Sequence, residues 1–327
     1  MNKLISWKPR ASIHNLFIRA KIINNIRIFF INRGLLEVET PVMSHTTVPD
    51  IYLFPFQTNL YFLEKVPEKG VPMYLITSPE YHMKRLLAAG SGPIFQICHS
   101  FRNQEYGNYH NPEFTLLEWY RPYYNMVDIM DEVNIFLQTI IHCDSAEMLS
   151  YQQVFRLHVG IDPLLAELDE LNQVLVKFNL SSTISLYNDR DKLLDFLFLM
   201  LVRPHLGNNK PVFIYNFPAS QSLLAELNSD DHRVAERFEV YFHGIELANG
   251  SRELTDADLQ RERFMQENNK QVAMNRPPRL IDEQLLAALE CGLPSCSGVA
   301  LGIDRLLMLT LKAKHISEVM AFSVTDA

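Results

Sequence analysis

Apolar residues recur at helical spacing over three stretches of the chain. In residues 13–32 they repeat every three or four positions, and Gly34 suits the end of a helix there. A second helix is predicted over residues 79–89, with Ser78 as its N-cap, because serine can accept a hydrogen bond from the first turn and proline fits its first position. A third helix is predicted over residues 126–142.

Shorter apolar runs bounded by turn residues predict strands. They lie at residues 35–43, where Pro41 ends the run, and at residues 74–77, 212–216, 238–247 and 299–303. Two further helices are predicted at residues 285–290 and 304–311, whereas residues 143–210 give weak helix and loop signals. Residues 193–202, which are apolar apart from Asp195, predict a buried helix because this stretch is too short to span a bilayer.

One stretch predicts a β-hairpin. An apolar run ends at Arg102, the polar loop 103–112 follows, and a second apolar run opens at Glu113. Strands in hairpins with helices gathered between them favour an α+β fold with an antiparallel β-sheet flanked by helices over a doubly wound parallel sheet. No GxGxxG or GxxxxGK[ST] run follows a predicted strand, so Rossmann and P-loop nucleotide sites are not indicated.

Composition narrows the class of protein. The chain has 327 residues, of which 47% are apolar and 21% charged, as is typical of a soluble globular protein. Its net charge of −8 makes a broad basic surface for nucleic acid unexpected. The four cysteines lack zinc-ligand spacing, and the N-terminal segment MNKLISWKPR lacks the apolar core of a signal peptide. These features predict a cytoplasmic protein with reduced thiols and no membrane span.

Two arginines are candidates for binding a polyphosphate. Arg102 ends the first strand of the hairpin beside a polar loop, where its guanidinium could bind a phosphate through two hydrogen bonds. Arg305 lies in the first turn after the strand in GVALGI, next to Asp304 at a predicted N-cap. A cation there opposes the helix dipole unless an anion is bound. The alternative for Arg102 is a surface ion pair with Glu105 or Glu113.

The return strand of the hairpin carries an aromatic ring and a carboxylate. Phe114 would usually belong to the core, but beside a phosphate site its ring could stack on a purine base. Glu118 and Tyr120 share one face of the strand, because side chains alternate with a period of two. Together with Glu80 and Glu253, Glu118 makes a set of three carboxylates that would suit a substrate with two ammonium groups.

Two glutamates predict a metal site. Glu239 and Glu246 flank a turn at residues 242–244, and a hairpin centred there would place them opposite each other. Like charges directly opposite are destabilising, and a divalent cation such as Mg²⁺ between them would remove the repulsion. The alternative is two solvated glutamates on an exposed sheet face. Strict alternation would put Glu246 and Asn249 on opposite faces, so a bulge near Gly250 is also predicted.

These segments together resemble class II aminoacyl-tRNA synthetases. FRNQE with HNPEF is similar to motif 2 of that family, SGVALGIDR to motif 3, and RGLLEVETPVM to motif 1, the dimer-forming element. TSPEYHMK, LEWY and ELANGSREL are similar to the lysyl-tRNA synthetase branch. The resemblance covers nearly the whole chain and implies a class II catalytic core.

One difference from lysyl-tRNA synthetases is as informative as the matches. Those enzymes carry an N-terminal β-barrel that reads the anticodon, whereas this chain starts almost at motif 1. In this it resembles the elongation factor P–(R)-β-lysine ligase family, as do the segments ASIHNLFIRA and PASQSLLAEL. The resemblance implies a single catalytic domain over residues 1–327, no anticodon-binding domain, and a homodimer. It also implies ATP and Mg²⁺ as cofactors, β-lysine or lysine as substrate, elongation factor P as partner, and no stable tRNA binding.

Carried over to the matching positions, the resemblance assigns roles to individual residues. Arg102 would hold the α-phosphate and Arg305 the γ-phosphate of ATP as catalytic residues, and Phe114 would stack on adenine. The rest of the ATP site would be Asn103, Gln104, His110, Asn111, Glu246, Leu247 and Gly302. Glu239 and Glu246 would hold Mg²⁺. The amino acid would be bound by Ser78, Pro79, Glu80, Glu118, Tyr120, Asn249, Glu253 and Ala300.

Three positions depart from the lysyl-tRNA synthetase pattern. Those enzymes carry glycine where this chain has Ala300, and one methyl group against the substrate's α-carbon could favour a β-amino acid, since one carbon in a pocket is worth about 1–3 kcal/mol. The alternative is that Ala300 only fills core space. Gln104 replaces a glutamate of motif 2, and Ser251 replaces an aromatic residue. The loop 103–112 also contains no lysine or arginine, which fits poorly with gripping a tRNA acceptor stem.

Three other functions remain open at this level. The chain could load lysine onto tRNA or another small carrier, or it could be a non-catalytic regulator related to synthetases. It could also be a different ATP-dependent amidating enzyme, such as an asparagine synthetase, although three carboxylates fit a diamine better.

Overall fold

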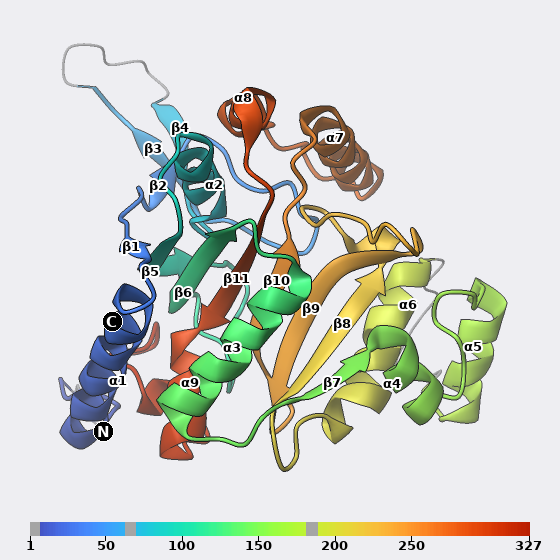
Figure 1. The fold of residues 1–327 in the computed structure, drawn as a ribbon, viewed down its shortest axis with the longest axis horizontal. Coiled ribbons are helices and arrows are strands. Elements are labelled where there is room, and N and C mark those ends of the chain that lie inside the picture. Colours follow the sequence, from blue (N-terminus) through green and yellow to red (C-terminus); the bar gives the residue numbers. More distant parts are fainter. Residues whose placement is uncertain (1–6, 63–69, 181–188) are drawn as a thin grey trace, which may run out of the picture. The chain divides into compact units, whose positions relative to one another are not determined.

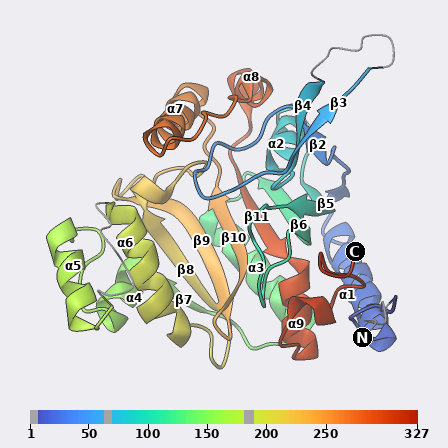
Figure 2. The ribbon, with the colours of Figure 1, turned by 180° about the vertical axis from the view of Figure 1, so that it is seen from behind.

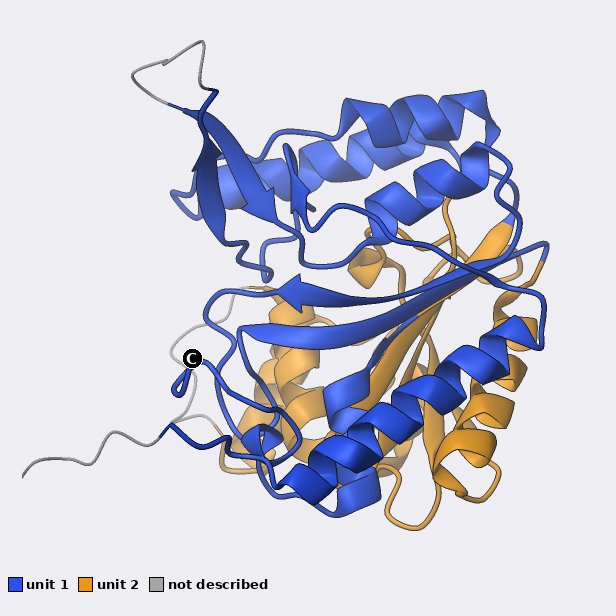
Figure 3. Ribbon diagram, turned by 90° about the vertical axis from the view of Figure 1, so that its left-hand side faces the viewer, with its two compact units in different colours: residues 1–123, 255–295, 300–327 blue, residues 124–254, 296–299 orange. Residues whose placement is uncertain are grey.

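The computed structural model describes residues 7–62, 70–180 and 189–327. Of the N-terminal segment 1–10, which lacks the character of a signal peptide, residues 1–6 lie outside the described part of the chain. The chain forms two compact units (Figure 3). Unit 1 contains residues 1–123, 255–295 and 300–327, and unit 2 contains residues 124–254 and 296–299.

Unit 1 holds the N-terminal helix, the predicted hairpin and most of the C-terminal part of the chain (Figure 1). Its helices are α1 (Ile13–Ile31), α2 (Glu80–Ala88), α7 (Ala257–Ala273), α8 (Glu283–Gly292) and α9 (Ile303–Leu311). Its strands are β1 (Leu36–Glu37), β2 (Met43–Ser44), β3 (Gln57–Leu60), β4 (Val71–Leu75), β5 (Ile94–Phe101) and β6 (Glu113–Pro122). Strand β11 (Cys296–Gly302) is divided between the two units at Val299.

The hairpin of unit 1 is confirmed. β5 and β6 pair antiparallel along the length of β5, from Ile94 opposite Tyr120 to Phe101 opposite Glu113. β1 runs parallel to β5, and β2, β4 and β3 form a separate small antiparallel sheet. The loop that joins β5 to β6 is therefore the polar stretch that the sequence pattern marks out.

Helix α1 packs against this hairpin. The ring of Phe30 lies 5.0 Å, between centroids, from each of the buried rings of Phe95 on β5 and Trp119 on β6. The periodic apolar pattern over residues 13–32 is confirmed as a helix, and Gly34 follows it with a φ of +76°, a left-handed conformation that glycine adopts without strain. The N-terminal helix thus supports the hairpin in which Arg102 directly follows β5 and Glu118 lies on β6.

Unit 2 combines antiparallel strands with helices on both sides. Its helices are α3 (Met126–Ile141), α4 (Tyr151–His158), α5 (Leu168–Lys177) and α6 (Arg190–Leu197), followed by a π-helical turn, η2 (Phe198–Val202). Its strands are β7 (Glu147–Ser150), β8 (Val212–Pro218), β9 (Val234–Phe242) and β10 (Ile245–Arg252). β8, β9 and β10 pair antiparallel, and β7 is parallel to β8.

The apolar core of unit 2 lies between helices α4–α6 and the strands beside them. Phe155 of α4, Leu194 of α6 and Ile214 of β8 are completely buried in it. Figures 1 and 2 show α4, α5 and α6 grouped beside β7 and β8, while α3 packs on β9 and β10. The larger sheet of the protein is mostly antiparallel and flanked by helices, which confirms the predicted α+β class.

Two predicted elements need correction. The short strand predicted to end at Pro41 is present but spans only Leu36–Glu37, and a separate strand, β2, begins at Met43 beyond Pro41, which lacks the N–H that a sheet ladder needs. Residues 193–202 are helical but not uniformly buried, since α6 passes into the π-helical turn, where Leu199 and Met200 are exposed. Within the described part of the chain, no helix has the length and apolar character needed to cross a membrane.

Candidate active site

Arg102 lies at the mouth of the hairpin in unit 1, directly after β5. Its guanidinium carbon is 5.1 Å from the centre of the Phe114 ring, and its Nε donates to the Thr77 carbonyl at 3.4 Å. The alternative surface ion pair is weak, because the distance from Arg102 Nη1 to the Glu105 carboxylate is 3.9 Å, and Glu113 contacts a histidine instead. The structure therefore brings Arg102 and Phe114 together.

The start of the hairpin loop is fixed by backbone contacts. The N–H of Asn103 donates to the Phe54 carbonyl at 2.7 Å, and the side-chain oxygen of Asn103 accepts from the N–H of Gln104 at 2.9 Å. Gln104 has a φ of +69° and an exposed side chain. These protein contacts hold the backbone of both residues, and their contacts with ATP stay a prediction.

The end of the loop is held by Asn111 and His110. The Asn111 side chain is buried, donates to the Glu113 carbonyl at 2.6 Å and accepts from the N–H of Val324 at 3.0 Å. The Nε2 of His110 lies 2.8 Å from Nη2 of Arg305. These contacts place the predicted γ-phosphate arginine against the motif 2 loop.

Arg305 is in the first turn of α9, but Asp304 is not its N-cap. The cap residue is Gly302, and the Asp304 carboxylate is buried. It accepts from the N–H of Thr115 at 2.7 Å and from Nη1 of Arg19 at 2.6 Å. The N-cap prediction was wrong because this carboxylate ties α9 to β6 and α1 instead of capping its own helix.

A hydrogen-bonded group in unit 1 contains four predicted substrate-binding residues, namely Ser78, Glu80, Glu118 and Tyr120. The carboxylate of Glu118 is buried and accepts from Ser78 Oγ and Tyr120 Oη, both at 2.7 Å. Ser78 Oγ also accepts from the N–H of Glu80 at 3.1 Å. The N-cap position of α2 nevertheless belongs to Pro79, so the serine predicted as N-cap lies one residue earlier.

Glu80 already has a cationic partner in the protein. Its Oε1 lies 2.6 Å from Nζ of Lys84, one turn later on α2. Lys84 is buried, with 1% of its surface exposed, whereas 23% of the Glu80 side chain is exposed. The carboxylate predicted to bind a substrate amine therefore also neutralises a buried lysine.

The thiols play no part in these contacts. Burial and the nearby Glu118 carboxylate raise the pKa of Cys98 to about 12, so this thiol stays protonated at neutral pH. All four cysteines lie in the described residues and are outside disulfide bonds.

Strands β9 and β10 of unit 2 carry the predicted metal ligands in a register different from the expected one. Glu246 lies opposite Tyr241, and Glu239 lies opposite Asn249. The predicted bulge exists, but it falls between Glu246 and Ala248 instead of near Gly250. Because residues directly opposite share a face, Glu239 and Glu246 lie on one face as diagonal neighbours, about 7–8 Å apart between Cα atoms.

Gly250 lies in the regularly paired part of β10, opposite Phe238. A Cβ atom there would lie 2.2 Å from Cγ2 of Val299 and 2.4 Å from the Phe238 ring, so only glycine fits. The extra residue of the bulge is Leu247, which is buried. Any contact of Leu247 with ATP would have to come from its backbone.

Glu239 is a buried carboxylate in a polar network. It accepts from the Arg237 guanidinium and the Tyr241 hydroxyl, and Asn249 Nδ2 lies 3.5 Å from it. Burial raises the pKa of Glu239 to about 7; the Arg237 guanidinium lowers it and the Glu246 carboxylate raises it. A cation shared by the two carboxylates would favour their ionised forms, so this pair fits Mg²⁺. Among the described residues, no three His, Cys, Asp or Glu side chains cluster as a metal site.

Glu253 and Ser251 lie at the end of β10. Ser251 Oγ donates to Glu253 Oε1 at 3.2 Å, and the Glu253 side chain is buried. The serine that replaces the family's aromatic residue thus orients a predicted substrate-binding carboxylate. Asn249 is on the same face of β10 as Ser251, since they are two residues apart in a regular stretch.

Ala300 and Gly302 lie at the unit 1 end of β11. Both are partly exposed, whereas Val299 and Leu301 are buried. The alternative role of Ala300 as core filling is therefore disfavoured. A Cβ on Gly302 would make only ordinary van der Waals contact with Arg305, 3.7 Å from its Cδ, so the packing around Gly302 does not itself require glycine.

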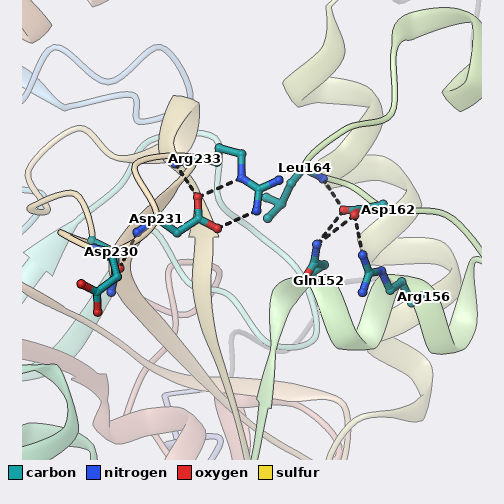
Figure 4. Close-up of polar contacts among 8 residues, drawn as sticks. Gln152, Arg156, Asp162, Leu164, Asp230, Asp231 and Arg233 are labelled. Atoms are coloured by element: carbon teal, nitrogen blue, oxygen red, sulfur yellow. Dashed lines mark hydrogen bonds and ion pairs between the residues drawn. The ribbon is translucent and has the colours of Figure 1, made fainter.

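A second charged cluster in unit 2 shares none of these residues. Figure 4 shows Asp162 bonded to Gln152, Arg156 and the N–H of Leu164, and Asp231 bonded to Arg233. These contacts join helix α4 to the segment after it and close the turn before β9. We call these residues the surface cluster; they belong to no predicted site.

Two residues of the site were missed in the sequence. Lys84 and Arg237 each neutralise a predicted ligand, Glu80 and Glu239 respectively. The signal for Lys84 is its opposite charge four residues after Glu80 on a predicted helix. The signal for Arg237 is its opposite charge two residues before Glu239 on a predicted strand.

Comparison with known proteins decides the family. The model of "tRNA synthetases class II (D, K and N)" matches residues 2–326. The chain belongs to this family. That match spans the residues of both units, and the family's ATP-dependent aminoacylation chemistry agrees with a site built from arginines and carboxylates.

Relatives within the family are similar over their full length. An elongation factor P–(R)-β-lysine ligase of Sodalis glossinidius is 61% identical over 327 residues, which is all of both chains. Proteins of the same name from Pectobacterium carotovorum and Salmonella dublin are 59% and 57% identical over the same length.

Proposed function

We propose that this chain activates (R)-β-lysine, or lysine, with ATP and transfers it to a lysine side chain of elongation factor P. The observation that carries the proposal is the hairpin of unit 1. It presents Arg102 against the Phe114 ring at its open end and the buried Glu118 carboxylate further along the same face of β6. One hairpin thus offers a guanidinium that can donate hydrogen bonds to a phosphate, a ring that can stack on a base, and a carboxylate that can accept from an ammonium group. The similar ligases support the choice of substrate.

The first step would be adenylate formation. A carboxylate oxygen of the amino acid attacks the α-phosphorus of ATP, the bond to the β-phosphate oxygen breaks, and pyrophosphate leaves. No general base is needed, because a carboxylic acid is ionised at pH 7. Arg102 and Arg305 would stabilise the charge that develops on the phosphates, so positioning and electrostatics supply the catalysis.

The two glutamates of unit 2 would contribute a metal ion. Mg²⁺ held by Glu239 and Glu246 would neutralise charge on the phosphates, with its other ligands supplied by ATP and water. Arg237 and Tyr241 hold the Glu239 carboxylate in place for this role.

The second step would be transfer. The ε-amine of a lysine on elongation factor P attacks the acyl carbon of the adenylate, AMP leaves with the bonding electron pair, and the amine loses a proton to solvent. The product is an amide. No side chain of the enzyme needs to form a covalent intermediate in this scheme.

An exchange assay followed by label transfer tests the proposal. ATP–pyrophosphate exchange should depend on a lysine isomer, and radiolabelled amino acid should appear on elongation factor P. Arg102→Ala should reduce exchange by about 10²-fold or more, as loss of a charge-stabilising donor does elsewhere. Label on tRNA alone, or no exchange with any lysine isomer, would overturn the proposal in favour of a tRNA ligase or a regulator.

Ala300 would select between isomers. Its partly exposed methyl group would contact the substrate's α-carbon, and its removal in Ala300→Gly should raise kcat/KM for α-lysine relative to β-lysine by about ten-fold. An unchanged ratio would show that the methyl group does not touch the substrate.

We also propose that the protein is a homodimer formed through α1. Ile22 and Ile26 of α1 are buried, while Phe17 and Ile28 on the opposite side are exposed at 73% and 48%. Apolar side chains on opposite sides of a helix need cover on both of those sides. Light scattering should give twice the chain mass of 37.9 kDa. Phe17→Asp with Ile28→Asp should give monomers, and a monomeric wild type at micromolar concentration would contradict the dimer.

A further inference from the structure

The ion pair between Glu80 and Lys84 joins a partly exposed carboxylate to a buried ammonium. The Nζ–Oε1 distance is 2.6 Å, and the exposed fraction is 2% for the lysine side chain and 23% for the glutamate side chain. Both residues are on α2, one turn apart, so the helix backbone fixes the distance between their Cβ atoms. The Glu80 carboxylate is thus held from one side and open from the other.

Among the described residues, the contact of this carboxylate with a cation is made by one of its two oxygens. Oε1 contacts Lys84, and no hydrogen bond from the described residues reaches Oε2. A glutamate side chain that is not held has several rotatable bonds and can point its oxygens in many directions. With Oε1 fixed on a buried ammonium, the direction of Oε2 is fixed as well.

We propose that Lys84 is a positioning residue that determines substrate specificity, because it fixes the direction in which Glu80 accepts the substrate's ammonium group. This inference rests on the proposed function, in which Glu80 binds an amino group of a lysine isomer. The α- and β-amino groups lie on adjacent carbons, so an acceptor oxygen of fixed direction meets one of them better than the other. A freely rotating carboxylate would follow either group.

Charge and direction can be separated experimentally. Lys84 also places a positive charge near the substrate, and its removal changes the affinity for any cationic substrate. The two isomers carry the same charges, so this effect cancels in the ratio of their kcat/KM values. That ratio reports on direction alone.

Two variants of equal length test the idea. Lys84→Met removes both the charge and the donor, whereas Lys84→Gln removes the charge but keeps an N–H donor for Glu80. In ATP–pyrophosphate exchange, Lys84→Met should lower the β- to α-lysine ratio of kcat/KM by about ten-fold or more, with the KM for ATP unchanged. Lys84→Gln should retain most of the wild-type ratio.

A matched control is available on another helix. Lys270 of α7 contacts Glu267 at the same distance, 2.6 Å, but 47% of its side chain is exposed. Lys270→Met should leave the isomer ratio and both KM values unchanged. A change there would show that the assay responds to the loss of any helical ion pair.

The outcomes are distinct. An active Lys84→Met enzyme with the wild-type isomer ratio overturns the inference, as does an equal fall in the Met and Gln variants. Absence of exchange in the wild type with every lysine isomer instead overturns the proposed function. If neither Lys84 variant folds, Glu80→Asp keeps the lysine and withdraws the carboxylate by one methylene group. Its isomer ratio must fall, and an unchanged ratio again contradicts the role of direction.

Discussion

Unit 2 carries two sets of carboxylates in opposite surroundings. In the surface cluster, hydrogen bonds from Arg233 lower the pKa of Asp231 to about 2. In the candidate metal site, burial raises the pKa of Glu239 to about 7, and the neighbouring Glu246 raises it too. Both carboxylates contact an arginine, yet their pKa values move in opposite directions.

The two pKa values differ because the two carboxylates differ in their solvation and in how far nearby positive charge compensates them. Asp231 is solvated and has a bidentate partner, so its charge is fully compensated by water and Arg233. Glu239 has lost its water, and Arg237 offsets only part of the cost of burying a charge beside a second carboxylate. The charge of Asp231 is thus compensated within the surface cluster, whereas Glu239 and Glu246 still lack positive charge, which is the property that the proposed Mg²⁺ site requires.

The largest expected effect comes from removing the carboxylate charge of Glu239, which Arg237 compensates only in part. Glu239→Gln keeps the shape of the side chain but removes one of the two charges that would hold Mg²⁺. ATP–pyrophosphate exchange should fall by about 10²-fold and require more Mg²⁺ for half-maximal rate. Asp231→Asn is the matched control and should leave both quantities unchanged. Equal exchange rates and equal Mg²⁺ requirements in the two variants would contradict the distinction between the candidate metal site and the surface cluster.

The pH dependence of the free energy of unfolding should also distinguish Glu239 from Asp231. In protein kept free of divalent ions, Glu239 holds its proton up to about pH 7, whereas an ordinary glutamate releases it near 4.5. The folded state binds more protons over that window, so the free energy of unfolding should decline as the pH rises from 4.5 to 7. Asp231 acts in the opposite sense, since its stabilisation is complete above pH 3.8 and is lost as the pH falls toward 2.

Urea unfolding between pH 4 and 8 in EDTA measures this. The Glu239→Gln variant should lose the decline between pH 4.5 and 7 that the wild type shows. Saturating Mg²⁺ should flatten the wild-type curve as well, because it favours the ionised carboxylate. Parallel curves for wild type and variant would mean that Glu239 is ionised without a metal.

The smallest effect is expected at the surface cluster. Arg233→Ala removes an exposed ion pair, and such pairs contribute little because water screens them. Exchange activity and the urea midpoint at pH 7 should stay within experimental error of the wild type. A large loss of activity would instead connect the surface cluster with the site.

The sequence predicts the parts of the fold that have a strong period. The apolar repeat over residues 13–32 and the polar loop 103–112 between two apolar runs correspond to α1 and to the β5–β6 hairpin. Residues 143–210 gave only weak signals, although they contain β7 and three helices among their described residues. Those helices are short and draw their stability from the shared core of unit 2, which local pattern does not reveal.

The residue types of the candidate site could be predicted from the sequence, but the register of the strands that carry Glu239 and Glu246 could not. The sequence places two glutamates on a hairpin, but it does not show that the bulge falls at Leu247 or that Val299 and Phe238 leave no room for a Cβ at Gly250. Asp304 was assigned to a cap because the distant partners Arg19 and Thr115 are invisible in a local pattern. Long-range contacts of this kind decide geometry that spacing alone leaves open.

Isomer-resolved ATP–pyrophosphate exchange, with Mg²⁺ present and followed by transfer to elongation factor P, tests the central claim most directly. The account predicts exchange with (R)-β-lysine above that with α-lysine, loss of exchange in Arg102→Ala, and label on elongation factor P but not on tRNA. Exchange that is absent with every lysine isomer, or that persists at the wild-type rate in Arg102→Ala, would contradict it.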